Sequence, residues 1–204
     1  MWHDIEQNNE AWMLMRSGKV TGSAVAKVMA NFGKAFGDPA RKLAVDLAVQ
    51  QITGKASEST FTNAHMERGH EQEPMARALY EEENFCEVGN GGFYDNGFTG
   101  CSPDGIVATG LIEIKSVIAS TQYATLKKGS FDSSYKWQIV FNLRESEKEW
   151  LDYVSFCAEF PVGSQLFTKR LYATEFTEEF KQLDARVAEF QDLVAEVKHD
   201  IESL

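Results

Sequence analysis

The chain has 204 residues, of which 43% are hydrophobic and 25% are charged, and its formal net charge at pH 7 is -11. This length and composition predict one globular domain over residues 1–204 and exclude a largely disordered chain. The apolar runs are too short for a membrane helix, and the first fifteen residues lack the features of a secretory signal. Three cysteines are too few for a disulfide framework or an iron–sulfur cluster. These features together predict a cytoplasmic protein.

The negative charge is unevenly distributed along the chain. Residues 175–204 contain nine acidic and three basic side chains. Two earlier segments are basic, with six basic side chains and one acidic in residues 16–42, and five and one in residues 114–144. Two such segments are consistent with a basic groove for nucleic acid and an acidic C-terminal segment that faces solvent. Two ordinary solvated surfaces would explain the same charges equally well.

The first predicted elements are helices. One is expected to follow Thr21 or Ser23 as its cap and to carry Val25, Val28 and Met29 on one side. Pro39 begins a second. A third covers roughly residues 61–83. Within it Pro74, which has no N–H, marks either a fresh helix start or a kink.

The middle of the chain changes to a strand period, and helices return at the end. The expected elements are a hairpin turning at residues 95–97, a hairpin turning at 109–110, helices over 119–128 and 133–143, strands over 150–157 and 166–172, and a long final helix. Thr177 is the expected cap of that helix, and its apolar stripe predicts packing against the sheet or another helix. This order predicts an α/β (α+β) fold with a mixed central sheet flanked by helices.

One stretch, SPDGIVATGLIEIKS at residues 102–116, places charged residues inside a predicted hairpin. Alternate strand residues share a face, so Glu113 and Lys115 point together while Ile112 and Ile114 point into a core. The hairpin pairing can bring Asp104, in the Ser-Pro-Asp-Gly turn, beside Glu113.

Two adjacent carboxylates repel each other unless a cation lies between them, and oxygen ligands favour a hard ion such as Mg²⁺ over zinc. This pattern therefore predicts a metal site. The alternative is a Glu–Lys pair on an exposed strand face.

These residues resemble the core motif of the PD-(D/E)xK nucleases and, more narrowly, of the phage lambda exonuclease (YqaJ-type viral recombinase) family. Three further segments resemble landmarks of that family in the same order: WMLMRSGKVTGS (12–23), RGHEQEPMARALYE (68–81) and SYKWQ (134–138). The resemblance implies a restriction-endonuclease-like core and a Mg²⁺-dependent 5′→3′ exonuclease, with Mn²⁺ as an alternative metal. Such an enzyme releases 5′-mononucleotides from the ends of double-stranded DNA.

The resemblance also implies a biological setting. It implies a homotrimeric ring that cooperates with a single-strand annealing protein in phage-type recombination. The gene would belong to a phage or prophage, and the protein would act in the cytoplasm of a bacterial host, without a membrane partner.

The resemblance assigns the chemistry to the charged hairpin. Asp104 and Glu113 would be metal ligands, with the backbone carbonyl of Ile114 as an extra one. Lys115 would position or activate the attacking water and offset negative charge in the transition state. Glu73 matches the helix acid of the family; a cap for the turn at Pro74 is its alternative role.

Other matched residues would orient the reactants or hold DNA. Gln138 matches the glutamine that orients the lysine or the water, and Tyr135 precedes it by three residues; for both, an ordinary half-buried helix position is the alternative. Arg16 and Ser23 match positions that hold the terminal 5′-phosphate, although Ser23 is also a suitable helix cap. Met66 falls where the family has a wedge that parts the terminal base pair, and a core methionine explains it equally well.

Two other functions remain open from the sequence. One is an endonuclease of the same fold that cuts internal or branched sites. The other is a non-catalytic DNA-binding or assembly protein that retains the fold.

Overall fold

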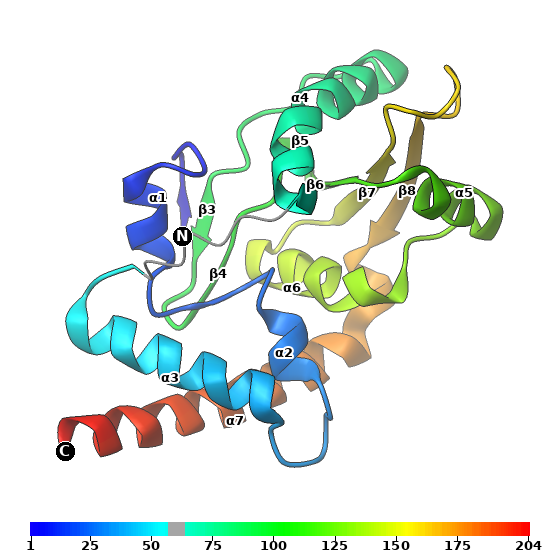
Figure 1. Ribbon diagram of the computed structural model, residues 1–204. Helices are drawn as coiled ribbons and strands as arrows, with labels where there is room; N and C mark the ends of the chain where they lie inside the picture. Colours follow the sequence, from blue (N-terminus) through cyan, green and yellow to red (C-terminus); the bar gives the residue numbers. More distant parts are fainter. Residues whose placement is uncertain (57–63) are drawn as a thin grey trace.

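The computed structural model describes residues 1–56 and 64–204, including all side chains in these ranges except those of residues 64–67. Figure 1 shows the arrangement of its elements. In chain order they are β1 (Trp2–His3), α1 (Glu10–Arg16), β2 (Val20–Thr21), α2 (Val25–Met29), α3 (Asp38–Thr53), α4 (Ala64–Asn84), β3 (Phe93–Asp95), β4 (Thr99–Cys101), β5 (Gly105–Val107), β6 (Gly110–Ser116), α5 (Ala119–Lys128), the 3₁₀ helix η1 (Ser133–Tyr135), α6 (Lys136–Ser146), β7 (Trp150–Phe156), β8 (Leu166–Tyr172), the 3₁₀ helix η2 (Ala173–Phe176) and α7 (Thr177–Glu202).

The strands form two mixed sheets in the described part of the chain. The first has the order β1-β3-β4-β2 and the second the order β5-β6-β7-β8. The pairs β2–β4 and β6–β7 are parallel, and the other neighbours are antiparallel. The prediction of a mixed sheet flanked by helices is confirmed, but the structure divides the strands between two sheets instead of one.

The second sheet separates two hydrophobic cores. On one face, Ile112 and Ile114 of β6 pack with Ala76 and Tyr80 of α4. On the other face, Leu111 of β6 packs in a larger core with buried side chains from α2, α3, α6 and α7. Because successive strand residues point to opposite faces, Glu113 points to the same side as Leu111. Both faces of β6 are therefore covered, and its carboxylate lies inside the protein.

Helix α4 continues through Pro74 without a break. In Figure 1 this helix changes direction along its length. Proline removes one helical hydrogen bond and its ring clashes with the preceding turn, so the kink is the expected outcome and a fresh helix start is not observed.

The long helix α7 packs against α3, α2 and α6, and Figure 1 shows α3 and α7 side by side. Its predicted stripe is buried at Leu183, Phe190 and Val194. Arg186 is also buried: its guanidinium lies 3.6 Å from the centre of the Phe36 ring and its Nε donates to the Val28 carbonyl oxygen at 3.1 Å. The helix thus closes the larger core and also holds the segment that follows α2.

The predicted helix caps are wrong. Helix α2 begins after Ala24, with no side-chain cap, because Thr21 belongs to β2 and pairs with β4. Helix α7 begins at Thr177 directly after η2, so Phe176 occupies the cap position and a cap by Thr177 is not needed.

The acidic C-terminal helix does not only face solvent. Glu179 accepts from Lys136 at 2.9 Å, and Asp184 pairs with Arg144 at 3.0 Å. These two basic residues of the segment 114–144 are therefore held against α7 and do not contribute to a separate basic groove.

In the part of the chain that the structure describes, no helix is long and apolar enough to cross a membrane.

A buried polar network fixes α4 on the second sheet. Tyr80 donates to Asp152 at 2.7 Å, and Arg170 donates to the same carboxylate at 2.8 and 2.9 Å.

We expect Tyr80→Phe to lower the free energy of unfolding by about 1–2 kcal/mol, since it removes one hydrogen bond to a charged group. The measurement is urea denaturation. Tyr123→Phe is the matched control, because Tyr123 is 57% exposed, and an equal loss in both variants would contradict the role of the network.

Candidate active site

The β5–β6 hairpin brings Asp104 beside the strand that carries Glu113. The backbone N–H of Asp104 donates to the carbonyl oxygen of Ile112 at 3.1 Å, and the N–H of Ile114 donates to Asp104 Oδ2 at 2.6 Å. The carboxylate of Asp104 therefore takes the place of a backbone carbonyl at this edge of β6, just beyond the point where pairing with β5 ends. Asp104 is thus held at a fixed position beside Glu113, although the two residues are nine positions apart in the sequence.

The turn that carries Asp104 is held from outside by distant residues. Arg77 of α4 donates to the carbonyl oxygen of Asp104, and Gln7 donates to that of Pro103 at 2.8 Å. Gly91 packs directly on the turn, because a Cβ at this position would lie 1.8 Å from the Pro103 carbonyl oxygen. The turn is therefore positioned by contacts and not by its own sequence alone.

The carboxylate of Glu113 is surrounded by donors. Lys115 Nζ donates to its Oε1 at 2.5 Å, and Gln138 Nε2 donates to the same oxygen. Asn142 Nδ2 donates to Oε2 at 2.7 Å. Gln138 and Asn142 are four residues apart on α6, so their side chains lie on one helix face above β6. Glu113 is 2% exposed, which excludes the alternative of a Glu–Lys pair on an exposed strand face.

Burial and mutual repulsion shape the protonation of the site. Burial raises the pKa of Asp104 to about 6 and that of Glu113 to about 7, and each value also reflects a neighbouring carboxylate. The pKa of Lys115 is raised because the attraction of Glu113 and Asp104 exceeds the effect of its burial. Burial raises the pKa of Glu73 too, while Arg77 lowers it. The lysine is therefore charged at neutral pH, whereas the two carboxyls bind protons more readily than usual.

These groups line a pocket of about 160 Å³. The pocket contains six of the residues predicted from the sequence: Arg16, Ser23, Asp104, Glu113, Lys115 and Gln138. Five further residues complete its wall: Gln7, Thr21, Gly22, Ser102 and Asn142. The structure thus joins the metal-site candidates and the phosphate-site candidates in one cavity.

Arg16 is held in place by aromatic packing. Its guanidinium carbon lies 3.8 Å from the centre of the Trp12 ring, and its NH2 atom is 3.5 Å from the Thr21 hydroxyl. Trp12 in turn donates to the Ser102 hydroxyl at 2.8 Å. Burial lowers the pKa of Arg16 to about 10, so it still carries its charge at neutral pH. Ser23 is exposed, with its hydroxyl 3.4 Å from that of Thr21, and does not cap a helix.

Glu73, Ile114 and Tyr135 do not line this pocket. Glu73 is half-buried on α4, with Oε1 3.8 Å from the guanidinium of Arg77, and it does not cap a turn because α4 continues past it. Tyr135 ends η1, and Lys115 Nζ lies 5.5 Å from the centre of its ring. The side chain of Met66 lies outside the described part of the structure.

The sequence interpretation missed two residues that contact Glu113 or Asp104: Asn142 and Arg77. Asn142 could have been found from its i+4 spacing to Gln138, which places both amides on the same face of a helix. Arg77 carried no comparable signal, because it binds a backbone carbonyl 27 residues away along the chain.

The oxygen-rich lining suits a hard divalent cation. In the part of the chain that the structure describes, no three acidic, histidine or cysteine side chains gather into a metal cluster. Asp104 and Glu113 are thus the two carboxylates available in the pocket. The Ile114 carbonyl faces the edge of β6 where its N–H meets Asp104, since the two groups of one strand residue point to the same neighbour. One or two carboxylates with waters and substrate phosphates are the usual ligands of Mg²⁺, so the residues present fit this ion.

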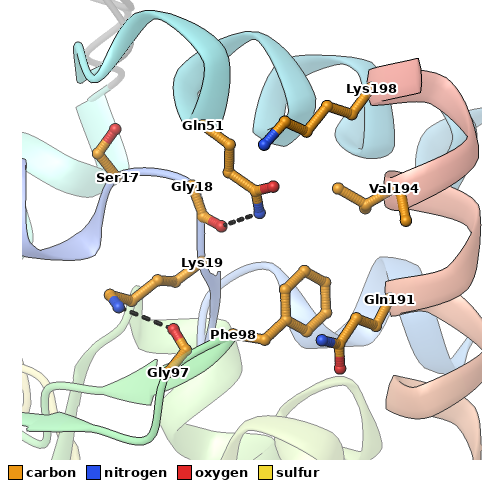
Figure 2. Close-up of a pocket in the computed structure, with 10 residues that line it drawn as sticks. Ser17, Gly18, Lys19, Gln51, Gly97, Phe98, Gln191, Val194 and Lys198 are labelled. Carbon is orange, nitrogen blue, oxygen red and sulfur yellow. Dashed lines mark hydrogen bonds between the residues drawn. The ribbon is translucent and has the colours of Figure 1, made fainter. Parts of the chain in front are cut away.

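Figure 2 shows a larger pocket of about 440 Å³ between α3, α7 and the β3–β4 turn. Its polar contacts are internal: Gln51 donates to the Gly18 carbonyl oxygen at 2.9 Å and Lys19 donates to that of Gly97 at 2.7 Å. No acidic side chain lines it. It therefore offers no carboxylate ligand for a metal, and the smaller pocket is the better candidate for catalysis.

Comparison with known proteins gives a consistent family. The model of the YqaJ-like viral recombinase domain matches residues 11–149. The alkaline exonuclease LHK-Exo from Laribacter hongkongensis has 31% sequence identity and a TM-score of 0.79, over 96% of this chain and 99% of that chain. LHK-Exo in complex with dAMP gives 32% identity and a TM-score of 0.80 over the same shares.

A phage related exonuclease from Haemophilus somnus 129PT shares the fold, with 16% identity and a TM-score of 0.65 over 90% of this chain and 96% of that chain. No curated protein gives a significant match. The similarity to the alkaline exonucleases and the family match confirm the expected PD-(D/E)xK fold class.

The raised pKa values predict how stability depends on pH. A carboxyl whose pKa is higher in the folded protein stabilises the fold while it is protonated, so the metal-free protein should lose stability as the pH rises from about 4 to about 7. Metal ligands must be deprotonated, so millimolar Mg²⁺ should raise the melting temperature more at about pH 8 than at about pH 5. Thermal melts in EDTA and in Mg²⁺ test this. Asp104→Asn is the control, and a Mg²⁺ effect that survives in this variant would place the cation elsewhere.

Proposed function

This chain belongs to the YqaJ-like viral recombinase domain family, and from this membership we propose that it is a Mg²⁺-dependent exonuclease that degrades double-stranded DNA from its ends in the 5′→3′ direction. The observation that carries the proposal is the pocket in which Asp104, Glu113 and Lys115 meet Arg16 and Ser23. A similar solved protein, LHK-Exo, was determined in complex with dAMP, which supports 5′-mononucleotides as products.

The protein residues would bind and orient the reacting groups. Asp104, Glu113 and the Ile114 carbonyl would hold Mg²⁺, or Mn²⁺ in its place. When bound, the cation lowers the pKa of the attacking water and offsets charge on the scissile phosphate. Lys115 is charged and can donate to the water and to a phosphate oxygen. Gln138 donates to the same oxygen of Glu113 as Lys115 does, and from there it would orient the lysine or the water.

Other residues would recognise the DNA. Arg16 and Ser23 supply a charged fork and a hydroxyl for a terminal 5′-phosphate, which is the group that a DNA end presents and an internal site does not. Tyr135 packs beside Lys115 and would line the path of the strand. Glu73 would act as the third acid of the site from α4, where its charge is felt by Asp104 and Glu113.

We also infer a homotrimeric ring that works with a single-strand annealing protein during phage-type recombination in a bacterial cytoplasm. The family membership supports this assembly, and a ring explains how a protein with net charge -11 can hold DNA, since basic residues in a channel act on DNA locally. Multi-angle light scattering of the purified protein should give three times the chain mass of 22.9 kDa. A monomer at working concentration would contradict the ring.

The nuclease activity is tested with linear and closed circular duplex DNA in the presence of Mg²⁺. We expect digestion of the linear form alone, and loss of at least about 100-fold in rate for Asp104→Ala or Lys115→Ala, because each removes a group that acts on the reacting phosphate. Cutting of circular DNA would favour the endonuclease alternative. Wild-type protein that binds DNA but leaves both forms intact would favour a non-catalytic role.

Recognition of the end is tested with Arg16→Ala. This change should slow digestion of 5′-phosphorylated ends by roughly 10- to 100-fold, since it removes a charge-assisted contact, and should have little effect on 5′-hydroxyl ends. Arg144→Ala is the matched control, because Arg144 is paired with Asp184 outside the pocket. An equal loss on both kinds of end would show that Arg16 does not read the phosphate.

A further inference from the structure

Asn142 is a buried amide that lines the pocket. It is 1% exposed and lies on α6, one turn beyond Gln138. Its Nδ2 donates to Glu113 Oε2, whereas Lys115 and Gln138 both donate to Oε1. The two oxygens of the same carboxylate are thus held by different residues, and Oε2 is held by Asn142.

The orientation of this amide is determined by its surroundings. The opposite orientation would place Oδ1 against the carboxylate of Glu113, where two acceptors repel each other. In the observed orientation Oδ1 is buried and has no hydrogen-bond partner among the residues that the structure describes. A buried acceptor without a donor is unfavourable, by about 1–3 kcal/mol in general. A residue kept only for stability would not normally leave such an atom unsatisfied.

Gly22 explains how the amide fits. A Cβ at position 22 would lie 2.8 Å from Asn142 Oδ1, so any larger residue would force this oxygen to shift. Gly22 lies between Thr21 and Ser23, in the segment proposed to bind the 5′-phosphate. Asn142 is therefore packed between the metal-site carboxylate and that segment, with a free acceptor at the pocket wall.

We propose that Asn142 is a positioning residue that orients Glu113 toward the divalent cation, and that its free Oδ1 accepts a hydrogen bond from water that enters the pocket with the cation. This inference rests on the proposed function. Lys115 and Gln138 contact the other oxygen of Glu113, so when either moves toward substrate, Asn142 still fixes the carboxylate. Residues that orient a metal ligand in this way typically change metal affinity when they are removed.

The test measures Mn²⁺ binding to the DNA-free full-length protein by isothermal titration calorimetry, together with unfolding in EDTA. Asn142→Ala should weaken Mn²⁺ binding roughly 10- to 100-fold. The matched control is Gln122→Ala, because Gln122 is a fully buried amide on α5 that contacts Ser155 and the backbone of residues 164–165. It should lower stability without changing Mn²⁺ affinity. Equal Mn²⁺ affinity in the wild type and Asn142→Ala, or an equal loss in the control, would overturn the proposal.

A second variant keeps the test decisive if Asn142→Ala does not fold. Gly22→Ala leaves every polar group in place but displaces Oδ1, so it should also weaken Mn²⁺ binding. Where Asn142→Ala does fold, adding Gly22→Ala to it should have no further effect, because the atom that Gly22→Ala displaces is gone. Unchanged affinity in Gly22→Ala would overturn the proposal. Wild-type protein that binds no Mn²⁺ would instead overturn the proposed function itself, and with it this inference.

Discussion

The two carboxylates of Asp104 and Glu113 lie in one buried pocket and repel each other. The groups around them stabilise both by donating hydrogen bonds. The N–H of Ile114 donates to Asp104. Glu113 accepts from the ammonium of Lys115 and from the side-chain amides of Gln138 and Asn142. Every one of these neighbours is a donor. One positive charge and several neutral donors offset only part of the negative charge of the two carboxylates, which leaves a place where a divalent cation is favoured.

The donors and acceptors come from rigid elements that are distant in the chain. β6 supplies Glu113 and Lys115, α6 supplies the two amides, and α4 holds the turn of Asp104 through Arg77. Side chains fixed on strands and helices keep their geometry better than side chains on loops, and accurate placement is what such a site requires. The same arrangement explains why residues far from the pocket, such as Tyr80, take part in its support.

The sequence correctly predicted those features that depend on residues close together in the chain, such as helix starts and the facing of strand side chains. Pro39 marked the start of α3, and the alternation around Glu113 placed its charge on the face opposite Ile112 and Ile114. The first sheet was not recognised as separate, because β1 and β2 have two residues each and show no periodicity. The burial of Arg186 was not predicted, because it depends on the Phe36 ring and on carbonyls more than 150 residues away. Contacts across such distances leave no trace in a local pattern.

Helix α7 covers apolar surface of α2 and α3, which are made much earlier in the chain. During translation these two helices leave the ribosome long before their covering helix exists, so their apolar faces stay exposed until the last segment emerges. The segment that carries Arg16 and Gly22 borders the same core. The core beneath this segment is therefore complete only after α7 has been made.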